Sequence, residues 1–307
     1  MALNTVVKFL DLPGIYEPSA IQQLADGRFL VVEDEKQHPF SLLSIDIHGC
    51  VSSTPVLLGF PEAGAGGLKL DDLEALARDQ SGNLYALTSH SRDGDGDAKK
   101  SRDKLVRFRI DGQHLLAPWV VDTLKPALTA AHPVLAAAAA VPDVKKSGGF
   151  NIEALEISPH QQRLLIGFRS PLQGQRAIIA SVENPAAIFG SGEPPRIGTR
   201  LQTLDLGGNG IRGMAYVPVL NGYLLISGPA ASAQVHFGLW FWSGLADAPA
   251  RRVSVAGLPG FEHAEGVCPA IIDGEQYILI VSDDGNREKG RCAHFLLLEP
   301  GQLQIAP

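Results

Sequence analysis

The sequence predicts an all-β protein, a β-propeller in which five blades are favoured, from three observations. A short motif recurs five times, with a small and then an apolar residue after a mostly acidic position. Each copy is followed by short apolar or alternating runs separated by turn residues, the pattern of strands joined by hairpins. A spare strand-like run near the N-terminus matches a strand that the last copy lacks. Such repeats are typical of propeller blades. The copies span residues 17–21, 72–76, 151–155, 210–214 and 263–267.

Each motif leads into a first strand, and three further strands complete the unit. Residues 5–12 are expected to supply the missing fourth strand of the last blade, which closes the ring and leaves only short sheet edges. Second strands are expected at 29–32, 84–88, 164–167, 223–226 and 277–281. Third strands are expected at 42–47, 105–110, 177–182, 237–242 and 294–298. Fourth strands are expected at 55–58, 114–123, 200–206 and 251–256.

One domain, residues 1–307, accounts for the whole chain. The longest interval between motif copies contains an Ala-rich insertion at 125–149, which three prolines divide and which we expect to form one or two short helices within a loop. A six-bladed propeller is the alternative, and it would require this insertion to hide a degenerate blade.

The amino-acid composition and net charge limit the kinds of partner that the chain can bind. The chain is 45% hydrophobic, enough for a large core, and its net charge of -7 argues against a nucleic-acid-binding surface. Three scattered cysteines suit a reducing compartment better than a disulfide framework. No signal peptide and no apolar run long enough for a membrane helix is recognisable in the sequence. We therefore expect a cytoplasmic protein without a membrane partner.

The first strands of a propeller line its central channel, so one motif position should form a ring at the channel mouth. Asp72 and His263 come two residues before that position and share its strand face. The loops after the second strands add His90, Arg169 and, in other blades, Asp34 and Asp283. The ring itself is predicted to consist of Ser19, Glu74, Glu153, Arg212 and Glu265.

Several ionised carboxylates in one ring require a counter-charge or a metal ion. Oxygen ligands favour calcium or magnesium. One hypothesis is therefore a divalent metal held by four carboxylates, namely Asp72, Glu74, Glu153 and Glu265.

The corresponding function is a metal-dependent hydrolase of a small anionic ester, such as a phosphoester. Arg169 and Arg212 would hold the anion. Glu153 would bind metal or act as a general base, and His90 or His263 would transfer a proton. The alternative is a non-catalytic propeller that binds a small ligand or a protein partner at the same mouth. A purely structural network of Glu–Arg pairs would explain the same residues.

Two other motifs give weaker indications of function. Residues 208–213 spell a dinucleotide-binding fingerprint, but a strand-like run with a proline follows where the motif requires a helix, so no nucleotide cofactor is expected. Residues 93–97 resemble the start of a calcium-binding loop. Ala98 and Lys104 stand where that loop needs Gly and Glu, which favours a solvated acidic loop.

Six short motifs lie at 72–76, 89–91, 151–155, 167–171, 207–212 and 265–266. In these motifs the sequence resembles a bacterial propeller family known only as a domain of unknown function, over about residues 17–299. The resemblance implies a propeller and no particular activity. The repeated Glu-Gly pattern is more distantly similar to the esterase-like phytase propellers, which would imply calcium-dependent cleavage of phosphoesters.

Overall fold

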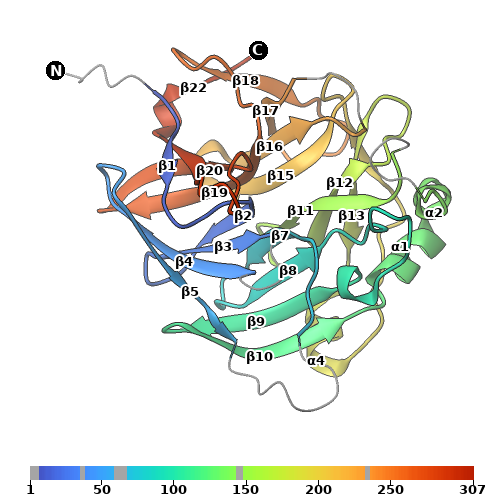
Figure 1. Ribbon diagram of the computed structural model, residues 1–307. Helices are drawn as coiled ribbons and strands as arrows, with labels where there is room; N and C mark the ends of the chain where they lie inside the picture. The colour runs from blue at the N-terminus through green and yellow to red at the C-terminus, as the bar shows by residue number, and fades with distance from the viewer. Residues whose placement is uncertain (1–6, 35–38, 59–67, 143–147, 232–235) are drawn as a thin grey trace.

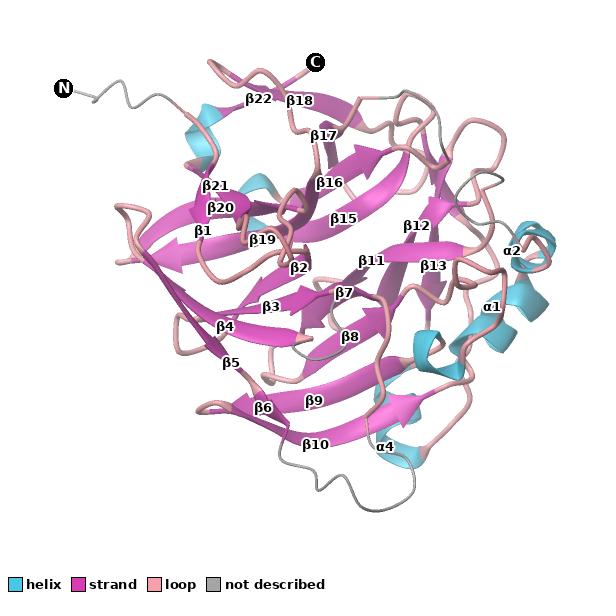
Figure 2. Cartoon of the chain, in the orientation of Figure 1, coloured by secondary structure: helices cyan, strands magenta, loops and turns pink. Residues whose placement is uncertain are grey.

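A computed structural model describes residues 7–34, 39–58, 68–142, 148–231 and 236–307. Its strands form five separate sheets of four or five strands, arranged around a common axis as the blades of a propeller (Figure 1). The predicted all-β fold and the five-bladed count are confirmed. The six-bladed alternative is wrong, because the described residues of the insertion form helices and contribute no sheet (Figure 2).

Within each blade the first three strands follow one another outward from the axis in sequence order and pair antiparallel. All five motif copies begin an inner strand, as predicted. The inner strands are β2 (Pro18–Gln23), β7 (Leu73–Arg78), β11 (Asn151–Ile157), β15 (Gly210–Val217) and β19 (Ala264–Ile272). The second strands are β3 (Phe29–Glu33), β8 (Leu84–Thr88), β12 (Leu164–Ser170), β16 (Gly222–Gly228) and β20 (Glu275–Ser282). The third strands are β4 (Phe40–Ile45), β9 (Leu105–Asp111), β13 (Ala177–Val182), β17 (Gly238–Trp242) and β21 (Ala293–Leu298).

The outermost strands close the ring. The N-terminal strand pairs with β21, with Leu12 opposite Ala293, so the predicted closure of the last blade is confirmed; residues 5 and 6 of the expected strand lie outside the described part of the chain. A C-terminal strand that sequence reasoning missed, β22 (Leu303–Ile305), extends blade 4 by pairing with β18. The fourth strands are β1 (Leu10–Leu12), β5 (Val51–Pro55), β10 (His114–Val121), β14 (Gln202–Leu204) and β18 (Arg251–Val255).

One fourth strand was predicted in the wrong place. The strand expected at 55–58 is instead β5, which ends at Pro55. The next two apolar residues form β6 (Leu57–Leu58), which leaves blade 1 and pairs parallel with β10 of blade 2. The outer strand has little core contact, and most of β5 is exposed, so its position is weakly determined by hydrophobic pattern.

The core consists of five clusters of buried apolar residues, each lying between two neighbouring blades. Phe40 of blade 1, for example, meets Phe108 of blade 2 edge to face, with ring centroids 5.3 Å apart. Both sheet faces are therefore covered, which explains why many strands are buried along their whole length, as in β3 and β8. This apolar packing holds the blades together, whereas the charged side chains of the motif residues face the propeller axis.

Two short helices, α1 (Leu124–Ala131) and α2 (Pro133–Ala139), occupy the Ala-rich segment. Leu124, Leu128 and Leu135 are fully buried against the cluster between blades 2 and 3. Residues 143–147 of the expected insertion lie outside the described residues. No helix in the described ranges is both long and apolar enough to cross a membrane. The other helical segments of the described residues are α4 (Pro185–Ser191), η1 (Lys100–Arg102), η2 (Pro218–Leu220) and η3 (Pro300–Gln302).

Candidate functional site

Every inner strand contains a β-bulge at the same motif position. In blade 2, Leu73 pairs with Thr88 and Ala75 pairs with Leu87, so Glu74 is the extra residue without a partner. A bulge turns the extra side chain out of the regular alternation of the strand. The same register shift leaves one extra residue in the other four blades, namely Ser19, Glu153, Arg212 and Glu265. All five ring residues line one pocket on the propeller axis.

The glycine that follows the bulge in blades 4 and 5 is required by close packing of the inner strands around the axis. A Cβ atom on Gly213 would lie 1.9 Å from the backbone oxygen of Glu265 in the next blade. A Cβ atom on Gly266 would lie 3.0 Å from the backbone of Ala20. The motif therefore encodes both the bulge residue that faces the pocket and the close contact that brings the next strand beside it.

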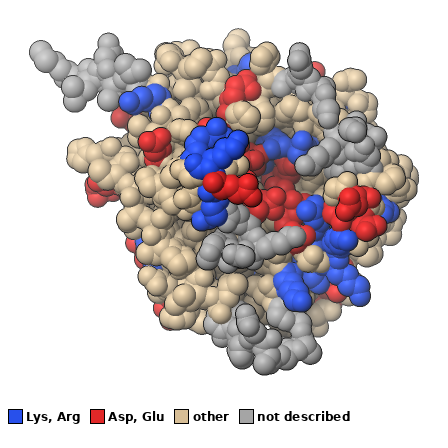
Figure 3. All heavy atoms as spheres, viewed as in Figure 1, with Lys and Arg blue, Asp and Glu red and all other residues tan. Residues whose placement is uncertain are grey.

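The pocket has a volume of about 550 Å³ and lies at one end of the axis. Acidic side chains gather inside it, with basic side chains at its edge (Figure 3). Beneath the ring, the apolar motif residues of all five blades leave a space of only about 10 Å³, which is about enough for one water molecule. The apolar residues that close the axis in this way are Ile21, Leu76, Leu155, Met214 and Val267.

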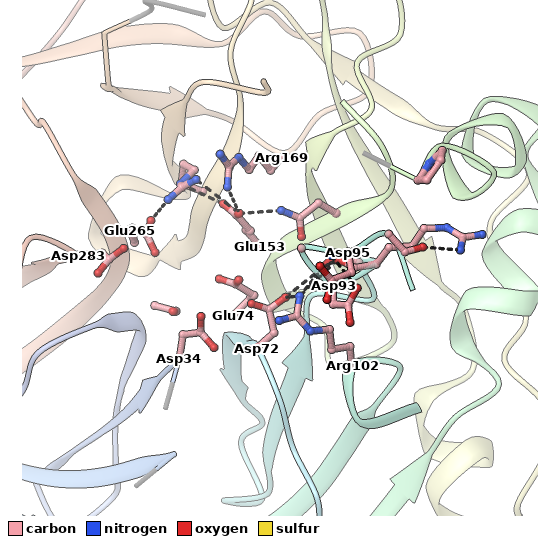
Figure 4. A pocket seen from close by; sticks show the side chains of 18 residues that line it. Asp34, Asp72, Glu74, Asp93, Asp95, Arg102, Glu153, Arg169, Glu265 and Asp283 are labelled. Atoms are coloured by element: carbon pink, nitrogen blue, oxygen red, sulfur yellow. Dashed lines mark hydrogen bonds and ion pairs between the residues drawn. The ribbon is translucent and has the colours of Figure 1, made fainter. Parts of the chain in front are cut away.

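Glu153 is the centre of an ion-pair network that joins three blades (Figure 4). Arg169 donates a hydrogen bond from Nη1 to Glu153 Oε1 at 3.0 Å, and the Asn151 amide donates to the same oxygen at 3.0 Å. Arg212 Nε lies 3.0 Å from Glu153 Oε2 without hydrogen-bond alignment, so that contact is an ion pair only. Arg212 also forms an ion pair with Glu265. Burial lowers the pKa of Arg212, although the charge of Glu153 opposes the effect.

Asp72 is held on the opposite side of the pocket. Its Oδ2 lies 2.9 Å from Arg102 Nη1 and accepts hydrogen bonds from the hydroxyls of Ser89 and Ser91. The backbone of Asp72 is in the left-handed region, with φ 63°, directly before the inner strand. Arg102 is the last residue of η1 (Lys100–Arg102), outside the repeated motifs, and was not predicted as a site residue; no sequence signal links it to Asp72.

Glu74 differs from the other ring acids because its carboxylate has no hydrogen bond or salt bridge to any residue in the described ranges. Burial, together with the charges of Glu153, Asp72 and Asp34, raises the pKa of Glu74 well above its usual range. Figure 4 shows the carboxyl groups of Asp34, Glu74, Glu265 and Asp283 directed into the same open space.

Asp34 and Asp283 follow second strands and line the pocket. Burial of the carboxyl group and the nearby charge of Asp72 raise the pKa of Asp34 to about 7. The residue as a whole is nevertheless exposed, and solvent screens such an effect. Burial is also the main reason that the pKa of Asp283 is raised, with Arg212 opposing it. Glu74 is less exposed to solvent than Asp34, so the upward direction of the Glu74 pKa shift is the firmer of the two.

Neither predicted histidine lines the pocket. His90 is fully buried, donates a hydrogen bond from Nδ1 to the Thr88 backbone oxygen at 2.8 Å, and has its pKa lowered to about 4 by burial. His263 is exposed and packs against Phe237, with ring centroids 5.8 Å apart. Their positions do not support the proton-transfer role predicted for them. Asp93 and Asp95, expected only in a solvated loop, do contribute to the pocket wall.

The predicted metal-ligand set does not fit a metal as it is arranged. Three of its four carboxylates already have arginine partners: Asp72 pairs with Arg102, while Glu153 and Glu265 pair with Arg212. Across the described ranges, no group of three or more His, Cys, Asp or Glu side chains is placed to hold a metal ion. We therefore derive no chemical step through a metal.

The fold and site define a five-bladed β-propeller with an acidic pocket at one end of its axis. The chain belongs to the family described as Protein of unknown function (DUF3616), whose model matches residues 122–297. The predicted resemblance to such a family is confirmed, whereas nothing supports the more distant link to phytase propellers. No curated protein matches the sequence.

Solved structures with a similar fold have little sequence in common with this chain. A GH43 β-1,3-galactosidase with galactodeoxynojirimycin is 9% identical with a TM-score of 0.51, over 96% of this chain and 98% of that chain. A PQQ-bound aldose sugar dehydrogenase from Streptomyces coelicolor is 16% identical with a TM-score of 0.48, over 98% of each chain. A periplasmic gluconolactonase from Pseudomonas aeruginosa is 11% identical with a TM-score of 0.41, over 94% of this chain and 78% of that chain. At these identities the likeness concerns the fold alone.

Proposed function

We propose that the axial pocket is the active site of a hydrolase that cleaves a C–O bond in a small polar molecule by general acid–base chemistry. The observation that carries this proposal is Glu74, a carboxyl group without a hydrogen-bond or salt-bridge partner in the described ranges, whose pKa is raised well above its usual range. A carboxyl group whose pKa is raised keeps its proton to a higher pH than an ordinary glutamic acid and can act as a proton donor.

In this reaction Glu74 donates its proton to the leaving-group oxygen as the C–O bond breaks. Ionised Asp34 accepts a proton from the attacking water, whose oxygen forms the new bond to carbon. Asp34 is more exposed to solvent than Glu74, so its carboxyl group is the more readily ionised of the two and can act as this base. The two carboxyl groups return to their starting states by exchanging one proton with solvent. The rate should therefore rise as Asp34 ionises and fall as Glu74 loses its proton.

The charges of the pocket favour an uncharged substrate over the anionic ester expected from the sequence. Eight carboxylates and four arginines line the pocket. Arg102, Arg169 and Arg212 already form ion pairs with acids of the same wall. An anion would have to compete with those acids for the guanidinium groups, whereas hydroxyl groups can donate to the carboxylates and accept from Arg or Ser.

Non-catalytic binding of a small ligand is the second candidate, and one observation favours it. The Glu153 network connects blades 3, 4 and 5, so a large part of the polar ring has a structural role. A propeller of this kind can present a polar cavity without performing chemistry. The two candidates differ in whether the bound molecule is turned over.

A substrate panel with matched variants tests the proposal. Wild-type protein, Glu74→Gln, Asp34→Asn and the exposed hairpin variant Glu275→Gln would be assayed with chromogenic uncharged esters, lactones and glycosides, and with phosphate esters. We expect turnover of an uncharged substrate, a loss of about 10²-fold or more in Glu74→Gln, and no change in Glu275→Gln.

Several outcomes would contradict the proposal. Turnover that survives Glu74→Gln would exclude Glu74 as the acid. Activity restricted to phosphate esters and abolished by a chelator would favour the metal-dependent hypothesis. Calorimetric binding of a panel member without turnover, lost in Glu74→Gln, would favour the non-catalytic candidate.

A further inference from the structure

We propose that a second cavity, on the flank of blade 2, binds a small organic anion that also carries an apolar portion. This proposal is independent of the function proposed for the axial pocket. The cavity has a volume of about 620 Å³ and lies where the segment before β7, the η1 turn and the end of β10 meet. Its lining residues are Leu68, Lys69, Leu70, Ala98, Lys99, Lys100, Ser101, Lys104, Val120 and Asp122.

The lining is strongly basic within an acidic protein. Four of the ten lysines of the chain line this cavity, against one carboxylate, while the whole chain has a net charge of -7. Lys99 pairs with Asp93 at 3.0 Å, but Lys69, Lys100 and Lys104 form no salt bridge to any residue in the ranges the structure describes. Like charges gathered in this way repel one another, and a bound anion would relieve that repulsion.

The lysines project from a backbone that is braced before any ligand arrives. The Asp71 amide donates a hydrogen bond to the Ser101 carbonyl at 3.1 Å, and the Thr88 amide donates to the Lys104 carbonyl at 3.0 Å. The Lys104 amide in turn donates to the Thr88 hydroxyl at 2.9 Å. A preformed frame reduces the ordering cost of binding.

The apolar part of the lining specifies the second feature of the ligand. Leu68, Leu70 and Val120 lie in the same cavity as the ammonium groups, and Val120 is 41% exposed although it is apolar. A phosphate or carboxylate attached to an aromatic or aliphatic group would satisfy both parts of the lining. The same turn directs Arg102 away from this cavity and toward Asp72, so the two sites are separate.

Titration calorimetry at low salt with phenyl phosphate and with benzoate tests the inference and distinguishes a phosphate from a carboxylate ligand. The variants are Lys69→Gln/Lys100→Gln, which alters two exposed side chains, and Lys104→Gln. The controls are Lys289→Gln, at an exposed site elsewhere, and Glu74→Gln in the axial pocket. Circular dichroism and thermal melting would verify that each variant is folded.

We expect saturable binding of at least one probe, weakened about tenfold or more in the double variant and in Lys104→Gln, and unchanged in both controls. Inorganic phosphate and phenol should each bind more weakly than phenyl phosphate, because each lacks one of the two recognised parts. Absence of binding by both probes would overturn the proposal. An equal loss in Lys289→Gln would also overturn it, since that result would show only a general charge effect.

Discussion

Glu153 shows how one residue can organise a charged pocket. Its carboxylate is only 3% exposed, and it is surrounded by Arg169, Arg212 and the Asn151 amide. A buried charge is tolerated when its partners supply both opposite charge and hydrogen bonds, and it is costly when one partner is lost. Because its two arginine partners come from different blades, this residue links ring geometry to pocket electrostatics.

Glu74 has no such compensation, which leads to a prediction about pH and stability. An acid whose pKa is raised in the folded state binds its proton more tightly there than in the unfolded chain. Its favourable contribution is complete below the unfolded pKa, about 4.5, and is lost as the pH rises toward the higher folded pKa. Glu74→Gln, which mimics the protonated acid, should therefore melt about 2 °C or more above wild type at pH 8.

The melting temperatures of wild type and Glu74→Gln should converge near pH 4, where both forms are neutral at this position. Glu275→Gln, at an exposed hairpin, serves as the control and should follow wild type at every pH. A Glu74→Gln variant that is less stable than wild type at pH 8 would show that the carboxylate is ionised and stabilised in the folded protein.

At the scale of the strand, the bulge is the device that builds the site. Simple alternation would place every second side chain of an inner strand on one face. The extra residue at Glu74 and at its four equivalents breaks that alternation near the start of each strand. The position of the ring was predictable from the repeated motif, whereas the bulge was not, because register depends on the partner strand.

The small residue after the bulge provides a test at this scale. Gly213→Ala should destabilise the protein by about 1–3 kcal/mol, because the new Cβ would meet the Glu265 backbone of the next blade at 1.9 Å. Gly190→Ala is the matched control, since a Cβ there meets nothing within 4 Å and the residue lies in α4. Urea unfolding of both variants would measure the difference. Equal stability of the two would mean that the inner strands can move apart without cost.

At the scale of the whole molecule, the two chain ends complete neighbouring blades. The N-terminal strand closes blade 5 through β21, and the C-terminal strand extends blade 4 through β18 (Figure 1). Leu12 belongs to the fully buried cluster between blades 5 and 1, while Ile305 is only partly buried beside the cluster between blades 4 and 5. Closure at the N-terminal end therefore contributes more apolar burial than the C-terminal addition.

Leu12→Ala should accordingly lower the free energy of unfolding by about 2–5 kcal/mol, because it opens a cavity in the cluster that closes the ring. Ile47→Ala, at a side chain that is 46% exposed, should change it by much less. Chemical denaturation measures both. If Leu12→Ala had as little effect as Ile47→Ala, the closing strand would not be needed for stability.

Repeated local sequence patterns explain which parts of the structure could be predicted from the sequence. Inner, second and third strands lie in the interblade core, so their apolar pattern was preserved and their places were predictable. The outer strand near Pro55 lacks that constraint and was misplaced, and β22 was missed for the same reason. His90 was chosen for its position after a second strand, but its side chain turns into the protein interior, where burial decides its chemistry.

By itself, the sequence determined the propeller class, favoured five blades over six, and located the closing N-terminal strand and the ring of motif residues, because each follows from a periodic pattern that must bury apolar surface. Only the tertiary structure decided which charges meet. The pairing of Asp72 with Arg102, the sharing of Glu153 by Arg169 and Arg212, and the lack of a partner for Glu74 among the described residues depend on contacts between distant segments. Coulomb energies and desolvation vary over a few ångströms, and no local pattern specifies such distances.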